Sequence, residues 1–209
     1  MNDRAQAAGA AAEVRRQAIL AAAGKVFLTK GYAAATMLEI ARLARTSKRA
    51  LYQHFASKRD ILDRIVLERS REMMAPIDMT APRSKAAFFE AVASFGAVFL
   101  GRLVEPTTIA LYRLAICEAG PSNDLGQALE ASGRAPVVEG MRRFLGQGAA
   151  QGWLETSDLD ALTEAYFDLL IGSVTMGQLL RTEPVPDAGA LNRRAERAAA
   201  ALKLLAKGF

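Results

Sequence analysis

Residues 47–55 bring basic, amide and phenol side chains together at a spacing that suits contact with nucleic-acid bases. If this stretch is a helix, Ala50 and Leu51 face the core and the polar residues share the outward side. The outward residues are Lys48, Arg49, Tyr52 and Gln53. Arginine pairs bidentately with guanine, glutamine pairs with adenine, and tyrosine donates to a phosphate or touches a thymine methyl group. Arg49 is therefore the first candidate for reading bases.

Residues at the predicted helix starts and edges are candidates for phosphate contacts, because the positive end of a helix favours anions. These candidates are Thr36, Ser47, Tyr52, His54 and Lys58. Thr36 and Ser47 would also cap helices in any helical protein, so a structural role is the alternative for both. His54 is the single histidine. It therefore has no second imidazole for a metal site and no companion for catalysis, and a hydrogen bond or phosphate contact is the better interpretation.

Positive charge is concentrated in the first third of the chain. Residues 1–75 carry 14 Lys and Arg against 7 Asp and Glu, whereas the whole chain has a net charge of +5. The segment 42–59 has no acidic residue and six basic ones, Arg42, Arg45, Lys48, Arg49, Lys58 and Arg59. Such an excess suits a phosphate backbone, and a basic surface without a nucleic-acid partner is the alternative.

Apolar residues recur three and four positions apart along the chain, which predicts an all-helical protein. The first helix is expected over about 11–30, with a core face that includes Val14 and Phe27, and Gly31 ends it. Thr36 and Glu39 form a predicted capping box at the start of a short second helix. Ser47 caps a third helix over 48–54, and Ser57 with Asp60 opens a fourth over about 58–74. Two short helices braced by two long ones predict a helix-turn-helix.

The rest of the chain predicts a larger helical domain. Pro76 and Pro82 mark the expected end of the fourth helix and the junction between domains. Further helices are expected near residues 83–103, 106–119, 134–151, 158–182 and 188–206, with a short helical turn around 125–131.

Several classes of protein are disfavoured by composition. Cys117 is the only cysteine, so no intrachain disulfide forms, and we expect it to be a small buried apolar residue in a reducing cytoplasm. No Gly-rich phosphate loop, nucleophile pair or metal-ligand cluster is visible, so we expect no enzyme, no cofactor and no metal. Apolar runs are interrupted well before the roughly 20 residues of a membrane span. Residues 1–10 are expected to form a loose arm.

The residues from Thr36 to Ala41 and from Leu51 to Lys58 resemble the N-terminal domain of the TetR (tetracycline repressor) family. The resemblance extends over about residues 14–62. It implies a homodimer that binds double-stranded, palindromic operator DNA with two recognition helices about one helical turn apart. The sequence departs from the family at Arg49, where Gly is frequent, and in the turn, where Arg45 and Thr46 replace the usual Gly-Val. Arg45 and Thr46 are therefore candidates for additional contacts to the DNA backbone or bases.

The same resemblance implies a small-molecule cavity among the middle helices and a dimer interface on the helices 158–182 and 188–206. Candidate ligand contacts are Phe99, Thr108, Tyr112, Arg113, Met141, Tyr166 and Gln178. The alternative for the apolar and aromatic members is an ordinary core. The effector is unknown, and an apolar or aromatic molecule is the default.

We therefore predict a DNA-binding transcription regulator, most simply a homodimeric repressor controlled by a small-molecule effector. The expected domains are the arm, a helix-turn-helix domain at 11–57, a connecting helix and junction at 58–79, and a ligand-binding and dimerisation domain at 80–209. An activator, a DNA-binding protein without ligand response, a nucleoid-type protein and a helical protein that binds another protein through its basic face are the alternatives.

Overall fold

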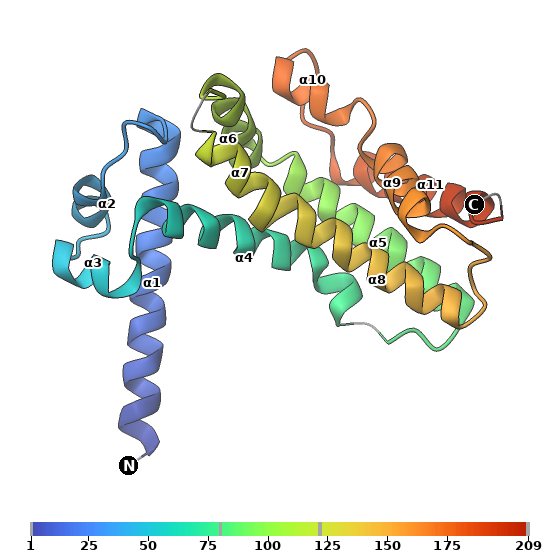
Figure 1. Ribbon diagram of the computed structural model, residues 1–209, viewed down its shortest axis with the longest axis horizontal. Coiled ribbons are helices and arrows are strands. Elements are labelled where there is room, and N and C mark those ends of the chain that lie inside the picture. Colours follow the sequence, from blue (N-terminus) through green and yellow to red (C-terminus); the bar gives the residue numbers. More distant parts are fainter. Residues whose placement is uncertain (1, 80, 121–122, 208–209) are drawn as a thin grey trace. The chain divides into compact units, whose positions relative to one another are not determined.

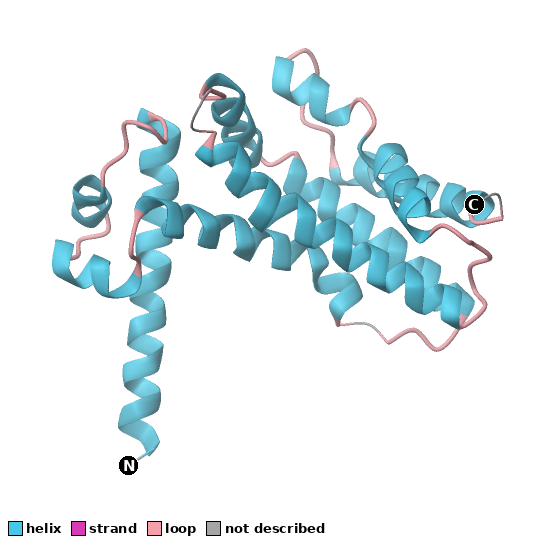
Figure 2. Ribbon diagram, in the orientation of Figure 1, coloured by secondary structure: helices cyan, strands magenta, loops and turns pink. Residues whose placement is uncertain are grey.

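The computed structural model describes residues 2–79, 81–120 and 123–207, with side chains from residue 9 onward. Every regular element in these ranges is helical (Figure 2), which confirms the all-α prediction. The chain forms two compact units. Unit 1 comprises Met1–Glu68 and Arg113–Ser132, and unit 2 comprises Arg69–Tyr112 and Gly133–Phe209. The sequence-based domain boundaries stay a prediction. Unit 1 combines the N-terminal segment with residues 113–132, which belong to the predicted domain at 80–209.

Unit 1 holds the N-terminal helices (Figure 1). They are α1 (Asn2–Lys30), α2 (Met37–Leu43), α3 (Lys48–His54) and the first part of α4 (Lys58–Asp78). The end of α6 (Pro106–Cys117), α7 (Asp124–Ala128) and most of the π-helical turn η1 (Leu129–Arg134) complete the unit.

The predicted starts of α2, α3 and α4 are confirmed. The Glu39 N–H donates to Thr36 Oγ1 at 3.3 Å, and the Thr36 N–H donates to Glu39 Oε2 at 3.1 Å, which completes the capping box. The Ala50 N–H donates to Ser47 Oγ at 3.0 Å at the start of α3. The Asp60 N–H donates to Ser57 Oγ at 3.1 Å at the start of α4. Gly31, with a φ of 87°, ends α1 as expected.

The core of unit 1 joins all of its helices. Ile19, Phe27, Ile40, Leu51 and Leu62 are buried in one cluster, and this cluster also contains Ala115, Leu125 and Ala128. Segments about 60 residues further along the chain therefore supply part of the core of the helix-turn-helix.

Three expectations for unit 1 are wrong. Helix α1 begins at Asn2, so residues 2–10 are helical where a loose arm was expected. Their alanine content explains this, because alanine has the highest helix propensity. Val14 is 72% exposed, since it lies on the part of α1 that precedes the buried residues from Ile19 onward. Cys117 is exposed at the end of α6.

Unit 2 is a helical bundle. It contains the end of α4, the first part of α6 and five complete helices. These five are α5 (Lys85–Leu103), α8 (Ala135–Ala150), α9 (Leu159–Ile171), α10 (Val174–Leu180) and α11 (Ala188–Leu205). Helix α11 packs against α5 and α9. Aromatic rings fill the core: Phe88 stacks on Phe144 with a centroid distance of 4.9 Å, and Phe99 meets Phe167 edge-on at 5.4 Å.

Two predicted helix ends in unit 2 are wrong. Helix α4 continues through Pro76 to Asp78 because a proline in the last turn removes only one backbone hydrogen bond. The expected helix over 158–182 is two helices, which break at Gly172 with a φ of 44°. Arg194 stabilises the break, since its guanidinium donates to the Leu170 carbonyl at 2.5 Å and to the Leu169 carbonyl at 3.3 Å. Cations stabilise the negative end of a helix in this way.

Among the described residues one helix, α5, is long and apolar enough to cross a membrane by length and composition alone. Eight of its residues are buried in unit 2, namely Phe88, Ala91, Val92, Phe95, Gly96, Phe99, Leu100 and Leu103. A single helix of this kind is weak support for a membrane span, because a core helix passes the same test.

Two glycines on α5 give a matched test of this packing. A Cβ at Gly96 would lie 2.9 Å from the Tyr166 hydroxyl, 3.0 Å from Ala195 and 3.1 Å from Leu170, whereas a Cβ at Gly101 would meet nothing within 4 Å. We expect Gly96→Ala to lower the free energy of unfolding by about 1–3 kcal/mol through overpacking. Gly101→Ala should raise it by up to about 1 kcal/mol through helix propensity. Urea unfolding of both variants measures the difference, and equal stabilities would contradict the close packing.

Candidate nucleic-acid interface

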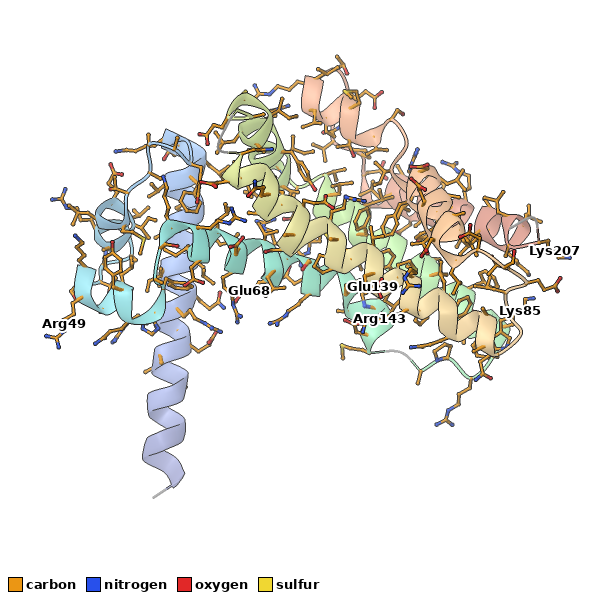
Figure 3. All side chains as sticks on the ribbon, viewed as in Figure 1. Arg49, Glu68, Lys85, Glu139, Arg143 and Lys207 are labelled. Carbon is orange, nitrogen blue, oxygen red and sulfur yellow. The ribbon has the colours of Figure 1, made fainter. Side chains whose placement is uncertain are left out.

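The outward face of α3 carries the four residues predicted from the sequence. Lys48, Arg49, Tyr52 and Gln53 are all exposed, whereas Leu51 is fully buried and Phe55 is 4% exposed. Figure 3 shows the Arg49 side chain pointing away from the body of unit 1. The Lys48 ammonium lies 5.8 Å from the centre of the Tyr52 ring, so the two side chains lie together on this face. The face presents donors for phosphate and base edges on a helix that is fixed by its buried side.

The hydroxyl groups of the two predicted capping residues, Ser47 and Thr36, differ in whether their hydrogen is available for a DNA contact. Ser47 Oγ accepts from the Ala50 N–H, and this leaves its own hydrogen available to a phosphate. The Thr36 hydroxyl instead donates to Glu39 Oε2 at 2.9 Å. Contact between Thr36 and a phosphate would therefore require its hydroxyl to rotate away from Glu39.

The turn between α2 and α3 is a Schellman motif closed by an arginine. The Arg45 N–H donates to the Arg42 carbonyl at 3.2 Å, and the Thr46 N–H donates to the Ala41 carbonyl at 3.0 Å. Arg45 has a φ of 53°, in the left-handed region. Glycine adopts this conformation freely, whereas a residue with a Cβ pays roughly 1–2 kcal/mol for it. The turn thus keeps the geometry of a glycine position while it exposes a guanidinium.

Glu39 links the start of α2 to the end of α1. Its carboxylate is paired with the Lys30 ammonium and also accepts from Thr36. The hydrogen bond from Lys30, followed by that from Thr36, lowers the pKa of the Glu39 carboxyl. Glu39 therefore stays ionised near neutral pH, and the stability that it contributes is lost only as the pH falls through its lowered pKa.

Lys58 has partners that the sequence did not indicate. Its ammonium donates to the carbonyl oxygens of Tyr32 at 2.8 Å, Ala33 at 2.9 Å and Ala35 at 3.4 Å. It also lies 4.6 Å from the centre of the Tyr32 ring. His54, the remaining predicted contact at the end of α3, is half-buried. No local spacing signal connects residues 32–35 to residue 58, so these contacts could only be found in the fold.

The residues predicted to bind a small molecule do not all belong to one unit: six belong to unit 2 and Arg113 belongs to unit 1. Phe99, Met141 and Tyr166 lie in the core cluster of unit 2, and Tyr112 packs against it. The Tyr166 hydroxyl donates to the Val92 carbonyl at 3.0 Å, and burial raises the pKa of Tyr166, so this hydroxyl stays protonated. Arg113, by contrast, belongs to unit 1.

Two predicted polar ligand contacts have structural partners. Thr108 Oγ1 accepts from Arg69 at 2.9 Å, and the same guanidinium donates to Glu105 at 3.0 Å. The Gln178 amide donates to the carbonyls of Glu183 at 3.3 Å and Pro184 at 2.9 Å. These hydrogen bonds give Thr108 and Gln178 a structural role, which is the alternative to ligand binding. The seven predicted ligand contacts stay a prediction.

A surface pocket of about 220 Å³ lies on the α9–α11 face of unit 2 and involves none of these residues. Its lining consists of Leu169, Arg194, Arg197, Ala198 and Ala201. Among the residues that the structure describes, no group of three or more His, Cys, Asp and Glu side chains is placed to hold a metal ion.

Two family models match separate parts of this chain. The family model described as bacterial regulatory proteins, tetR family, matches residues 19–65. The model described as AefR-like transcriptional repressor, C-terminal domain, matches residues 90–203, which is more than half of the chain. The chain belongs to the TetR family of bacterial transcription regulators. These regulators bind DNA and are not enzymes, so both expectations are confirmed at the level of the family.

Curated relatives match mainly in the N-terminal unit. The transcriptional regulator HbdR of Aromatoleum sp. (strain CIB) is 48% identical over 50 residues, which are 24% of this chain and 22% of HbdR. The transcriptional activator FasR of Mycolicibacterium smegmatis is 53% identical over 47 residues, 22% of each protein. The chain thus spans about a fifth of the length of these two relatives. The transcriptional regulator AlkX of Mycobacterium tuberculosis is 25% identical over 164 residues, 77% of this chain and 75% of AlkX.

Solved structures share the fold. A TetR transcriptional regulator from Agrobacterium tumefaciens has a TM-score of 0.76 at 24% identity, over 91% of this chain and 93% of the other. The flavonoid-responsive regulator FrrA has a TM-score of 0.71 at 22% identity, over 91% and 95%. These likenesses confirm an N-terminal helix-turn-helix domain followed by a helical C-terminal domain.

Arg45 provides a test of the turn geometry. We expect Arg45→Gly to raise the free energy of unfolding by about 1 kcal/mol, because glycine removes the cost of the left-handed conformation. Arg45→Ala removes the same charge and keeps the Cβ, so its stability should lie within about 0.5 kcal/mol of the parent. Denaturant unfolding of the three proteins without DNA measures both effects. If the glycine variant were no more stable than the alanine variant, Arg45 would carry no backbone strain.

Proposed function

We propose that this protein is a cytoplasmic repressor that binds a palindromic operator as a homodimer and is released or retained by a small-molecule effector. The observation that carries the DNA-binding part is the exposed face of α3. This face consists of Lys48, Arg49, Tyr52 and Gln53, and the opposite side of the helix is anchored by the buried Leu51. A recognition helix needs this combination of a fixed inner side and polar outer side.

Arg49 and Gln53 are the proposed base-reading residues, since their side chains suit guanine and adenine edges. The other proposed contacts are Thr36, Arg45, Thr46, Ser47, Lys48, Tyr52 and His54. The backbone of Arg45 supports the proposed contact for this residue. Arg45 has a left-handed, strained conformation that places its charged side chain in solvent, and such strain is often retained at functional sites.

The proposed dimer interface is the α9–α11 face, within the ranges 158–182 and 188–206. Helix α9 exposes the acidic residues Asp160, Glu164 and Asp168 at intervals of four, and α11 exposes Arg193 and Arg197 at the same interval. Leu169 and Leu204, which are 42% and 75% exposed, add apolar surface. In a two-fold interface the acidic α9 of one subunit can pair with the basic α11 of its partner, and each pairing occurs twice.

The proposed effector is an apolar or aromatic molecule that contacts residues among Phe99, Thr108, Tyr112, Arg113, Met141, Tyr166 and Gln178. The aromatic core of unit 2 supports this class, as does the similarity of fold to FrrA, a regulator described as flavonoid-responsive. Control of DNA binding requires the effector to bind one conformation of the dimer more tightly than the other.

Repression is favoured over activation by the extent of the matches. The model described for repressors covers residues 90–203, whereas the activator FasR matches over 47 residues only. Activation of transcription is the alternative, and a reporter fused to the bound promoter distinguishes the two in cells with and without the protein.

Operator recognition is tested on the DNA upstream of the protein's own gene, at two salt concentrations. We expect Arg49→Ala to weaken binding to the preferred palindrome by about 1–3 kcal/mol, because one bidentate base contact is lost. Arg143→Ala removes the same charge from the exposed surface of α8 (Figure 3) and should leave the affinity nearly unchanged. Equal effects of the two substitutions, or no preference over random DNA, would contradict the assignment of α3.

Charge reversal tests the dimer interface. Glu164→Arg and Arg197→Glu should each raise the dimer dissociation constant by at least about tenfold, because like charges then face each other across the interface. The double variant restores opposite charges and should regain most of the affinity. Sedimentation of the three proteins measures the dissociation constants, with Glu90→Arg on the exposed surface of α5 as control. A double variant as weak as the sum of the single ones would exclude this pairing.

A further inference from the structure

The chain between α1 and α2, residues 31–36, is here called the α1–α2 loop. It contains no helix or strand, yet it places Thr36, the residue that caps α2. A side chain from a distant part of the sequence binds this loop. Glu118 Oε1 accepts from the Ala33 N–H at 3.3 Å, although the two residues are 85 positions apart. Both residues belong to unit 1.

A second contact brings the same carboxylate oxygen against the start of the loop. A Cβ at Gly31 would lie 2.9 Å from Glu118 Oε1 and 3.8 Å from Cδ1 of Leu114, one turn earlier on α6. Gly31 also has a φ of 87°. Glycine therefore suits this position for two reasons, the left-handed backbone and the close approach of Glu118.

Glu118 lies at an unfavourable place for an anion. It follows the last residue of α6, and its own N–H donates to the Leu114 carbonyl at 2.8 Å, so it stands at the C-terminal end of that helix. The C-terminal end of a helix is negative and disfavours a carboxylate. The Ala33 N–H supplies a favourable partner, and a half-buried glutamate at this point is explained by the loop that it binds.

Apolar burial holds the loop only in part. Tyr32 and Ala35 are 4% and 3% exposed, and they lie in the same core cluster as Ala115 of α6. Burial is not directional, so it does not specify the place of the exposed backbone between these two side chains. The hydrogen bond from Ala33, which lies between them, supplies that specification.

The loop in turn fixes the helix-turn-helix. It ends at Thr36, whose N–H and hydroxyl donate to Glu39 in the capping box. Helix α2 packs against α1 and α3. A displacement of the loop would therefore move the start of α2 and, through α2, the outward face of α3.

We propose that Glu118 is a positioning residue for DNA recognition: its carboxylate, at the end of α6, holds the backbone of the α1–α2 loop and so sets the place of α2 and α3. Glu118 acts through Ala33 and the capping box. The proposal rests on the proposed DNA-binding function, but its first consequence concerns the protein without DNA.

Two substitutions at Glu118 separate the hydrogen bond from the charge. Glu118→Ala removes both. Glu118→Gln removes the charge and keeps a carbonyl oxygen that can accept from the Ala33 N–H. Glu90→Ala is the matched control, because it removes a glutamate charge from the exposed surface of α5.

The first measurement is amide hydrogen exchange in the free proteins, with thermal unfolding to compare their global stability. We expect exchange at Ala33 and Thr36 to rise roughly tenfold or more in Glu118→Ala, because the loop loses a hydrogen bond to a charged acceptor. Glu118→Gln should restore most of the protection, and Glu90→Ala should match the parent. Unchanged exchange at Ala33 in Glu118→Ala would overturn the proposal, and so would a rise that is spread evenly over the whole chain.

Gly31 gives an independent check of the contact. Gly31→Ala should displace the Glu118 carboxylate, because the new Cβ would lie 2.9 Å from Oε1. The destabilisation by Gly31→Ala should therefore be smaller in the Glu118→Ala background than in the parent, which a double-mutant cycle of urea unfolding measures. Fully additive effects would contradict the contact between Glu118 and the loop.

The second measurement is affinity for the preferred palindrome and for random DNA. Glu118→Ala and Glu118→Gln have the same net charge, so a difference between them does not come from long-range attraction to DNA. We expect Glu118→Ala to bind the palindrome roughly 3- to 30-fold more weakly than Glu118→Gln, and both to bind random DNA equally well. A displaced recognition helix loses discrimination in this way, whereas a partly unfolded protein would lose affinity for both DNAs.

Equal palindrome affinities of the two Glu118 variants would overturn the proposal. If the parent protein preferred no palindrome, the proposed function would fail separately. A selective rise of exchange at Ala33 and Thr36 in Glu118→Ala would then still establish that Glu118 holds the loop.

Discussion

Helices α2 and α3 have seven residues each, and helices of that length are not stable in isolation. Their existence depends on the burial of a few apolar side chains, above all Ile40 and Leu51, which are both fully buried. The caps at Thr36 and Ser47 fix where each helix begins, but they contribute only about 1 kcal/mol each. Burial therefore holds the two helices in place, and the polar outer face of α3 is free to vary without loss of the fold.

This burial is not confined to the N-terminal segment. Ala115, Leu125 and Ala128 lie in the same cluster as Ile40 and Leu51, so residues 113–132 help to hold the helix-turn-helix. Helices α4 and α6 each contribute residues to both units. The core that holds α2 and α3 therefore includes side chains from α6 and α7 as well as from the N-terminal helices.

Features that depend on residues three or four apart could be predicted from the sequence, and features that depend on distant residues could not. The capping box of Thr36 and Glu39 and the outward face of α3 are local, and both were predicted. Val14 fits the apolar period of α1, but it precedes the buried residues, which begin at Ile19, and it is exposed. At the break at Gly172, the last carbonyls of α9 accept hydrogen bonds from Arg194, which lies on another helix. The apolar pattern runs through the break, so periodicity alone predicts one helix.

The same distinction applies to charge. Six basic residues lie in the segment 42–59, but two of them serve the fold: Lys58 binds loop carbonyls, and Arg59 is paired with Asp63 at 3.0 Å. The other four, Arg42, Arg45, Lys48 and Arg49, are exposed. They follow one another from the end of α2 through the turn to the first residues of α3. Positive charge available to a partner is thus concentrated at the N-terminal end of the recognition helix, where helices of this motif contact base edges. Since electrostatic attraction acts before specific contacts form, it would bring that end of α3 to the DNA first.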